Sequence, residues 1–216
     1  MRRILEKFRI AKKWFFDALL PPQCIFCGME NTFLCDTHRK FLPAPPQSPP
    51  PFLDEIFAAV QYHHFVAEKV VQKFKYDGFR DIAAICADEI AKKIPAEIFK
   101  NAVLFPIPLF WTRKFWRGFN QSEILAREIQ QKFPAAKISK KLIRRKKTVQ
   151  QAKLKNKFER EKNLRDAFFW PKNLPVPPKI ILVDDVAATG ATLSAAAKIL
   201  RDAGAQKIFG LVFARS

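Results

Sequence analysis

A buried strand that runs directly into two acidic residues and a loop of small side chains constrains the fold more than any other feature. Residues 179–193 contain the continuous apolar run Ile180–Val183, followed by Asp184 and Asp185. An apolar run without polar alternation is typical of a parallel strand that is covered on both faces. A helical pattern follows over 195–200. The stretch therefore predicts a strand, a loop and a helix of a parallel α/β sheet.

The loop of this unit is suited to a phosphate group. Its residues are Ala188, Thr189, Gly190, Ala191 and Thr192. The free N–H groups and the positive dipole end at the start of a helix attract anions, and a glycine lets the backbone approach a ligand closely. The two threonines add hydroxyl donors. Asp184 and Asp185, expected at the strand tip, are acceptors for the vicinal hydroxyls of a ribose. Together these features predict a site for a 5-phosphoribosyl group.

A second pattern lies near the amino terminus. Its ligand spacing is C-x2-C-x7-C-x2-H, formed by Cys24, Cys27, Cys35 and His38. Two closely spaced pairs can place four ligands around a tetrahedral Zn²⁺. The neighbouring apolar residues are too few for a core, so a metal would hold this module folded. The alternative is a set of unligated side chains. The remaining cysteine, Cys86, lies in a helical apolar pattern and is predicted to be a small core residue.

A proline-rich segment divides the chain. Six of the nine residues in 43–51 are proline, which predicts an extended spacer. Residues 1–42 would then hold an amino-terminal helix and the zinc module, and residues 52–216 the α/β domain. Residues 1–20 form a basic amphipathic pattern, which packs on the protein itself or binds an anionic membrane surface. No run of 18 uncharged apolar residues and no signal-peptide centre occurs, so a cytoplasmic protein is expected.

The charge balance indicates a polyanionic partner. The chain has 39 basic and 20 acidic residues and a formal net charge of +19, far more than one phosphorylated ligand needs. Nucleic acid is the first candidate. Between 137 and 162 there are twelve basic residues and two acidic ones, which follow a phosphate backbone or form a solvated face. Aromatic residues interleave with basic ones nearby and either stack on single-stranded bases or belong to the core. They are Trp111, Phe115, Trp116 and Phe119.

Strand and helix patterns alternate from residue 52 onward. Strands are expected at 56–62, 103–107, 180–183 and 207–213, and helices at 66–76, 81–93 and 195–200. A basic segment over 111–119 precedes a further helix, with Ser122 as its N-cap. This order predicts an open, mostly parallel sheet with helices on both faces and a ligand at the carboxyl ends of the strands.

Several motifs occur in a fixed order. After the cysteine pattern come Phe74–Gly78, Phe105–Leu109, Arg117–Ser122, Leu142–Arg145, Thr148–Leu154, Asn163–Phe168, the Asp-Asp loop and Ala214–Arg215. Over nearly the whole chain this order resembles one branch of the type I phosphoribosyltransferases, the ComF competence family of bacterial proteins. The chain differs from the family pattern at Ala188, where a threonine is usual, and at His38, where a cysteine is usual.

The resemblance implies a ligand, 5-phosphoribosyl 1-pyrophosphate (PRPP), bound with Mg²⁺. The catalytic residues would be Asp184 and Asp185, which hold the ribose. A set of residues after the second strand would hold the pyrophosphate: Arg113, Arg117, Gly118, Asn120 and Gln121. A mobile loop that closes over the site would contribute Gln151, Arg160 and Asn163. The family's context implies uptake of single-stranded DNA during natural transformation, at the cytoplasmic face of the inner membrane, beside DNA-uptake channel or helicase partners.

Three functions are compatible with these features. The first is a DNA-uptake factor that binds single-stranded DNA and carries a PRPP site. The second is a metabolic phosphoribosyltransferase of nucleotide salvage or of the amidophosphoribosyltransferase type, although the sequence shows no segment for recognising a nucleobase. The third is a non-catalytic scaffold with a vestigial PRPP pocket. Pyrophosphate release from PRPP distinguishes the enzymes from the scaffold.

Overall fold

The structure is a computed structural model that describes residues 21–43, 45, 48–76, 82–146 and 167–216. The chain divides into two compact units, Met1–Leu42 and Pro43–Ser216. The predicted amino-terminal helix over 1–20 lies outside the described residues, as does most of the basic run. The same is true of three predicted site residues, Gln151, Arg160 and Asn163.

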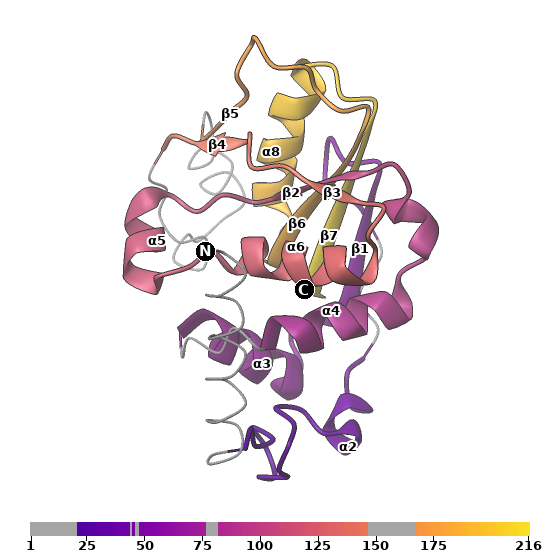
Figure 1. Ribbon diagram of the computed structural model, residues 1–216, viewed down its shortest axis with the longest axis vertical. Helices are drawn as coiled ribbons and strands as arrows, with labels where there is room; N and C mark the ends of the chain where they lie inside the picture. The colour runs from indigo at the N-terminus through magenta and orange to yellow at the C-terminus, as the bar shows by residue number, and fades with distance from the viewer. Residues whose placement is uncertain (1–20, 44, 46–47, 77–81, 147–166) are drawn as a thin grey trace, which may run out of the picture. The chain divides into compact units, whose positions relative to one another are not determined.

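A five-stranded parallel sheet with the order β1-β7-β6-β2-β3 forms the centre of the larger unit (Figure 1). The strands are β1 (Glu55–Gln61), β2 (Val103–Pro106), β3 (Lys137–Ile138), β6 (Lys179–Ala187) and β7 (Lys207–Arg215). β6 pairs with β7 along its whole length and with β2 on its other side. A short antiparallel pair, β4 (Ile143–Arg144) and β5 (Phe168–Phe169), forms a second sheet.

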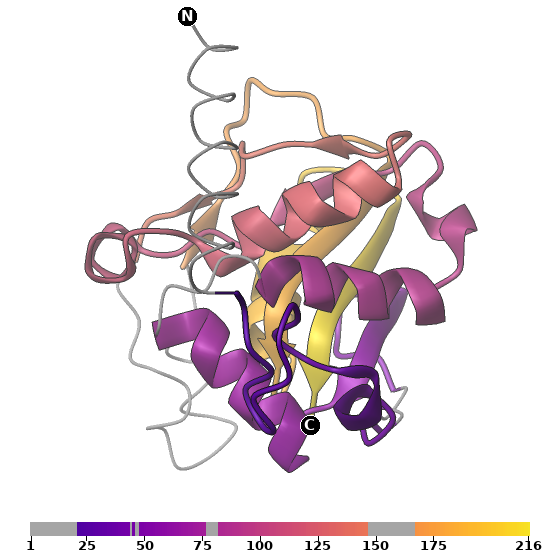
Figure 2. The same cartoon turned by 60° about the horizontal axis from the view of Figure 1, so that its bottom comes forward.

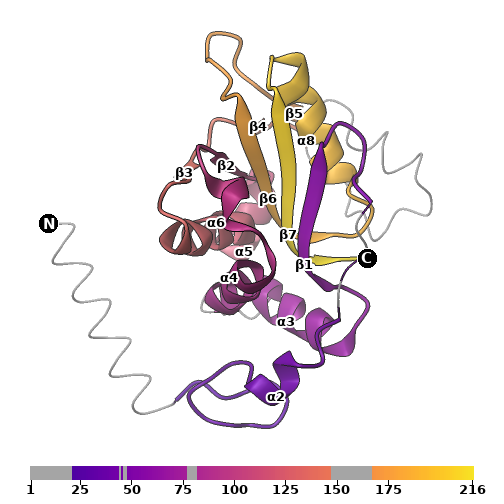
Figure 3. The same ribbon diagram turned by 90° about the vertical axis from the view of Figure 1, so that its right-hand side faces the viewer.

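Helices cover both faces of the sheet. The helices of this unit are α3 (Phe65–Tyr76), α4 (Ile82–Lys93), α5 (Trp111–Arg117), α6 (Gln121–Lys132) and α8 (Ala191–Asp202), with a 3₁₀ turn at Ala96–Phe99. Figure 2 shows α4 and α6 side by side across the strands, and Figure 3 shows α8 on the opposite face. The predicted α/β class, a parallel sheet between helical layers, is confirmed. Among the described helices, none has the length and apolar character needed to cross a bilayer.

The continuous apolar run of β6 is buried from both sides. Ile180 and Leu182 belong to the same buried apolar cluster as Leu193 of α8. Ile181 and Val183 alternate with them, and all four residues of the run are 0% exposed. Each such side chain stabilises the fold by roughly 1.5–3 kcal/mol relative to an exposed one. This run therefore fixes β6 at the middle of the sheet.

The elements around the predicted site differ from expectation in three details. β6 continues to Ala187 because β7 pairs alongside it, so the two acids lie within the strand rather than at its tip. The segment after β2 folds as helix α5, which ends at Gly118 in the left-handed conformation with φ of 71°. The N-cap of α6 is Asn120, not Ser122, because the Asn120 side chain accepts a hydrogen bond from the Ser122 backbone N–H.

The proline-rich segment contacts the larger unit. The Gln61 backbone N–H donates to the Pro43 carbonyl at 3.0 Å, and the Arg215 guanidinium donates to the Ser48 carbonyl. A β-carbon added at Gly190 would lie 2.7 Å from Pro50. The described part of 43–51 is therefore held against the sheet domain, whereas the composition predicts only an extended spacer.

Candidate functional site

The smaller unit brings its four predicted metal ligands together. One ligand atom from each of Cys24, Cys27, Cys35 and His38 lies within 4.8 Å of all the others. The Cys35 sulfur is 3.0 Å from His38 Nδ1, and the Cys27 and Cys35 sulfurs are 3.8 Å apart. Ligands of a tetrahedral zinc, bound at about 2.0–2.3 Å, lie at comparable separations. The cluster is therefore consistent with a structural zinc site, as the spacing predicts.

A tight turn and the start of a short helix position these four ligand residues. The first pair sits on a tight turn in which the Gly28 N–H donates to the Cys24 carbonyl at 2.9 Å. The second pair opens the short helix α2 (Asp36–Arg39), whose N-cap is Cys35. Burial opposes the thiolate of Cys24, but hydrogen bonds from backbone N–H groups, first that of Cys35, outweigh it and lower the pKa of Cys24 to about 6. A thiolate is the form that binds a metal.

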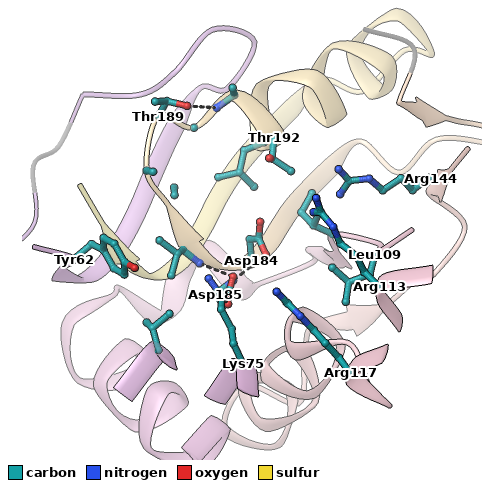
Figure 4. A pocket seen from close by; sticks show the side chains of 18 of the residues that line it. Tyr62, Lys75, Leu109, Arg113, Arg117, Arg144, Asp184, Asp185, Thr189 and Thr192 are labelled. Atoms are coloured by element: carbon teal, nitrogen blue, oxygen red, sulfur yellow. Dashed lines mark hydrogen bonds and ion pairs between the residues drawn. The ribbon is translucent and has the colours of Figure 1, made fainter. Parts of the chain in front are cut away.

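The larger unit contains a cavity of about 430 Å³ at the carboxyl edge of its sheet. Figure 4 shows the acids at the centre of this cavity, the loop before α8 on one side and arginines of α5 and β4 on another. Nine of the predicted residues line it: Arg113, Arg117, Asp184, Asp185, Ala188, Thr189, Gly190, Ala191 and Thr192. The fold thus brings together the predicted acid pair, phosphate loop and two arginines.

The loop has the local geometry that a phosphate cradle requires. Gly190 is the N-cap of α8 and has φ of 71°, a conformation that glycine adopts without strain. The Thr189 hydroxyl accepts a hydrogen bond from the Ala191 N–H at 3.4 Å. The amino end of α8 therefore opens on the cavity, where its dipole favours a negative charge.

The carboxylates of Asp184 and Asp185 accept three hydrogen bonds, and Asp185 also forms an ion pair. The Ser122 hydroxyl donates to Asp184 Oδ1 at 2.8 Å, and the Asp185 N–H donates to the same atom at 3.0 Å. Burial and the charge of Asp185 raise the pKa of Asp184 to about 7, although these hydrogen bonds favour its ionised form. Asp185 accepts from the Val186 N–H at 2.9 Å and pairs with Lys75 Nζ at 3.2 Å.

Cationic side chains surround the acids. Burial alone would lower the pKa of Lys75, but the attraction of Asp185 and Asp184 outweighs it and raises that pKa. Burial and the neighbouring Arg113 lower the pKa of Arg144 to about 10, so its guanidinium stays charged at neutral pH. With Arg113 and Arg117, the cavity therefore has four cationic residues and two carboxylates on its walls, an arrangement suited to a ligand with several negative charges.

Three predicted residues lie behind the cavity wall instead of on it. Gly118 is the C-cap of α5. Asn120 is 3% exposed, and its amide donates to the Ile107 carbonyl at 3.0 Å. Gln121 is 2% exposed; its amide donates to the Lys75 carbonyl and its oxygen accepts from Arg117. These residues hold the ends of α3, α5 and α6, while direct contact of theirs with a pyrophosphate stays a prediction.

Ten residues that line the cavity had no predicted role, and three of the polar ones, Tyr62, Lys75 and Arg144, bear on its chemistry. Tyr62 follows β1, Lys75 lies in the last turn of α3, and Arg144 lies on β4. Lys75 and Arg144 occur in motifs that carried the family resemblance, but no role was assigned to them. Their presence in a shared motif order was the available signal.

Relatives of this chain occur among competence and DNA-utilization proteins. Competence protein F of Haemophilus influenzae is 34% identical over 107 residues, 49% of this chain and 46% of that protein. DNA utilization protein YhgH of Salmonella typhimurium is 29% identical over 169 residues, 75% of this chain and 72% of that protein. Competence protein ComFC of Streptococcus pneumoniae is 33% identical over 145 residues, 65% of this chain and 60% of that protein.

The similarity thus spans about half the length of Competence protein F and a larger share of the other two. No protein-family model matches the chain. The chain is similar to competence and DNA-utilization proteins, at 29–34% identity over 49–75% of its own length.

Proposed function

We propose that this protein is a DNA-uptake factor whose cavity binds PRPP and whose surface binds single-stranded DNA. The observation that carries the proposal is the single volume of about 430 Å³ that is lined at once by an acid pair, a helix amino end and three arginines. An acid pair suits a ribose diol, the helix end suits a 5′-phosphate, and the arginines suit a pyrophosphate. Similar proteins are named for competence and for DNA utilization.

The residues divide the ligand between them. Asp184 and Asp185 accept hydrogen bonds from the ribose hydroxyls, and the backbone of 188–192 binds the 5′-phosphate. Arg113 and Arg117 compensate the charge of the pyrophosphate, whether it stays bound or leaves. Carboxylate oxygens are also the ligands that Mg²⁺ prefers, and Mg²⁺ bound with PRPP neutralises part of the pyrophosphate charge.

Calorimetry with PRPP and Mg²⁺ tests the cavity. Wild type is expected to bind, and Asp185→Asn is expected to weaken binding by about tenfold or more, because a hydrogen bond to a charged acceptor is lost. Asp202→Asn is the matched control, since Asp202 pairs with Lys198 on α8 and does not line the cavity. Wild-type protein that gives no heat with PRPP would refute this assignment, and equal affinities in the two variants would refute the role of the acid pair.

Helix α5 supports the proposed DNA contact. Its aromatic residues Trp111, Phe115 and Trp116 are 70%, 81% and 86% exposed, and Figure 1 shows the helix at the margin of the larger unit. Phe119, by contrast, is buried in the core. Three exposed aromatic side chains among basic residues offer flat surfaces for stacked bases and charges for the phosphate backbone. The excess positive charge of the chain favours the same partner.

Fluorescence anisotropy with a single-stranded oligonucleotide tests this contact. Trp116→Ala is expected to weaken binding by roughly tenfold, because one stacked base contributes about 1–3 kcal/mol. Phe65→Ala is the control, because Phe65 is an aromatic residue that is 58% exposed but lies on α3 instead of α5. Affinity should fall steeply as salt is raised. An affinity that is insensitive to salt, or a control variant that binds as weakly as Trp116→Ala, would count against the contact.

Attachment to the inner membrane belongs to the same proposal and depends on residues 1–20. Their basic, amphipathic sequence is suited to an anionic lipid surface. Sedimentation with anionic vesicles should recover the full chain and leave a chain without residues 1–20 in solution. Equal sedimentation of the two chains would exclude this segment as the attachment site.

A further inference from the structure

Lys75 forms an ion pair with the acid pair of the cavity. Its Nζ lies 3.2 Å from Asp185 Oδ2, and the two side chains are 22% and 11% exposed. Figure 4 shows Lys75 reaching from α3 to the base of Asp185. A lysine this deep in a protein keeps its charge only beside a partner that compensates the lost solvation.

The position of Lys75 is fixed from behind. The Gln121 amide donates to the Lys75 carbonyl at 3.4 Å, and the Gln121 oxygen accepts from the Arg117 guanidinium at 3.2 Å. Gln121 is buried at the start of α6. The end of α3 is therefore connected to the start of α6 and to an arginine of the cavity wall, which fixes the backbone from which Lys75 reaches Asp185.

The Lys75 ammonium group reduces the repulsion between the two carboxylates. Two adjacent carboxylates repel each other, and Asp184 accepts hydrogen bonds from two uncharged donors, the Ser122 hydroxyl and the Asp185 N–H. The Asp185 Oδ1 atom accepts from the Val186 N–H. A cation beside Oδ2 therefore removes part of the repulsion and leaves the pair able to accept hydrogen bonds from a ligand.

We propose that Lys75 is a positioning residue, the built-in counter-cation that orients Asp185 to recognise the vicinal hydroxyls of a pentose phosphate. This inference rests on the proposed phosphoribosyl site and deepens it. It has two consequences. Recognition of the 2-hydroxyl depends on Lys75, and the acid pair of the free protein has little affinity for a divalent cation because the ammonium already occupies that place.

Calorimetry with ribose 5-phosphate and with 2-deoxyribose 5-phosphate tests the first consequence. Wild type is expected to prefer ribose 5-phosphate by about tenfold, the effect of one hydrogen bond to a charged acceptor. In Lys75→Met the ratio of the two affinities should approach one, while Lys75→Arg keeps most of it. The matched control is Lys73→Met, which removes a charge from the same helix at a residue that does not line the cavity. The ratio is informative because a general loss of positive charge weakens both ligands equally.

Electron paramagnetic resonance with Mn²⁺ alone tests the second consequence. Wild type should show no Mn²⁺ site that Asp185→Asn removes, whereas Lys75→Met should gain one. An unchanged affinity ratio in Lys75→Met, or an Asp185-dependent Mn²⁺ site in wild type, would overturn the inference. Failure of wild type to bind either pentose phosphate or PRPP would instead overturn the proposed function, so the two failures are distinguishable. The Mn²⁺ measurement on wild type and Asp185→Asn decides the matter even where Lys75→Met does not fold.

Discussion

The metal-ligand cluster and the parallel sheet maintain their structures by different means. Among the described residues of the smaller unit, the buried apolar side chains are Cys24, Leu34, Cys35 and Leu42, and two of these are ligand residues. In the sheet, by contrast, the apolar run of β6 is fully buried between two helical layers. The smaller unit is thus expected to need a bound ion to stay folded, while the larger unit has an apolar core of its own.

The metal-ligand cluster and the cavity also differ in how many parts of the chain form them. The four ligands of the cluster lie within fifteen residues of sequence, all in the smaller unit. The cavity gathers residues from β6, α3, α5 and β4, so it exists only when the sheet is folded. Perturbations that unfold one unit should therefore leave the other intact, and this can be measured.

The largest expected effect is that of removing a metal ligand. Cys35→Ser should abolish zinc binding and unfold the smaller unit, because structural zinc sites contribute apparent binding free energies of about 10–16 kcal/mol. The thermal transition of the larger unit should be unchanged. Zinc content and limited proteolysis measure the first effect, and calorimetry measures the second.

Cys86→Ala is the control for this experiment, because Cys86 is a buried thiol of α4 outside the cluster. It should keep one zinc per chain. If Cys35→Ser retained both its zinc and its resistance to protease, the smaller unit would be shown to fold without a complete ligand set.

The next largest effect is expected from the centre of the sheet. Leu182→Ala should lower the free energy of unfolding of the larger unit by about 2–5 kcal/mol, because a fully buried side chain is replaced by a cavity. Leu182→Met, which conserves volume, should cost under about 1.5 kcal/mol. Urea unfolding measures both variants. Zinc content should not change, and a fall in zinc content would show that the two units depend on each other.

Both of these regions were predictable because their signals are local in the sequence. The ligand spacing of Cys24 to His38 lies within fifteen residues, and the run Ile180–Val183 is contiguous. The loop before α8 follows this run directly, so its place at the carboxyl edge of the sheet was predictable as well. Cys86 is confirmed as a core residue for the same reason, since it lies on a periodic helical face.

Residues that join the cavity from distant parts of the chain were not predictable in this way. Lys75 and Arg144 lie on α3 and β4, and only the folded sheet brings them to the cavity that Asp185 also lines. Helix α5 has seven residues, too few turns for a periodic pattern, and its aromatic side chains face outward instead of toward a core. Asn120 and Ser122 are both good capping residues, so sequence alone did not decide between them.

A smaller effect, on the pH dependence of stability, is expected from Asp184 in the cavity. The pKa of Asp184 is raised to about 7 from an ordinary value near 3.8. Between these values the folded chain binds more protons than the unfolded chain, so this group makes stability fall as pH rises from about 4 to about 7. Asp184→Asn should therefore be more stable than wild type at pH 8, by on the order of 2 kcal/mol after solvent screening, and similar to it near pH 4.

Urea unfolding at several pH values measures this gain. Asp202→Asn is the control, because the exposed pair of Asp202 with Lys198 should give no comparable change over the same range. A stability difference between Asp184→Asn and wild type that stays constant from pH 4 to pH 8 would contradict the assignment. A gain that appears only at high pH would show that the sheet domain tolerates an unfavourable charge in its cavity.

The smallest effect is expected at the start of α6, where the Asn120 cap contacts Ser122 and Ser122 contacts Asp184. Asn120→Ala removes the acceptor of the Ser122 N–H and the donor to the Ile107 carbonyl, and loss of such a cap costs about 1 kcal/mol. Asn120→Asp keeps the acceptor and should cost less. Because Ser122 also donates to Asp184, the Ala variant should bind PRPP more weakly than its loss of stability explains. Calorimetry of both variants tests this. Equal affinities would mean that the cap supports the fold alone, whereas a selective loss of affinity would show that the rigidity of the sheet domain is transmitted to its cavity through this residue.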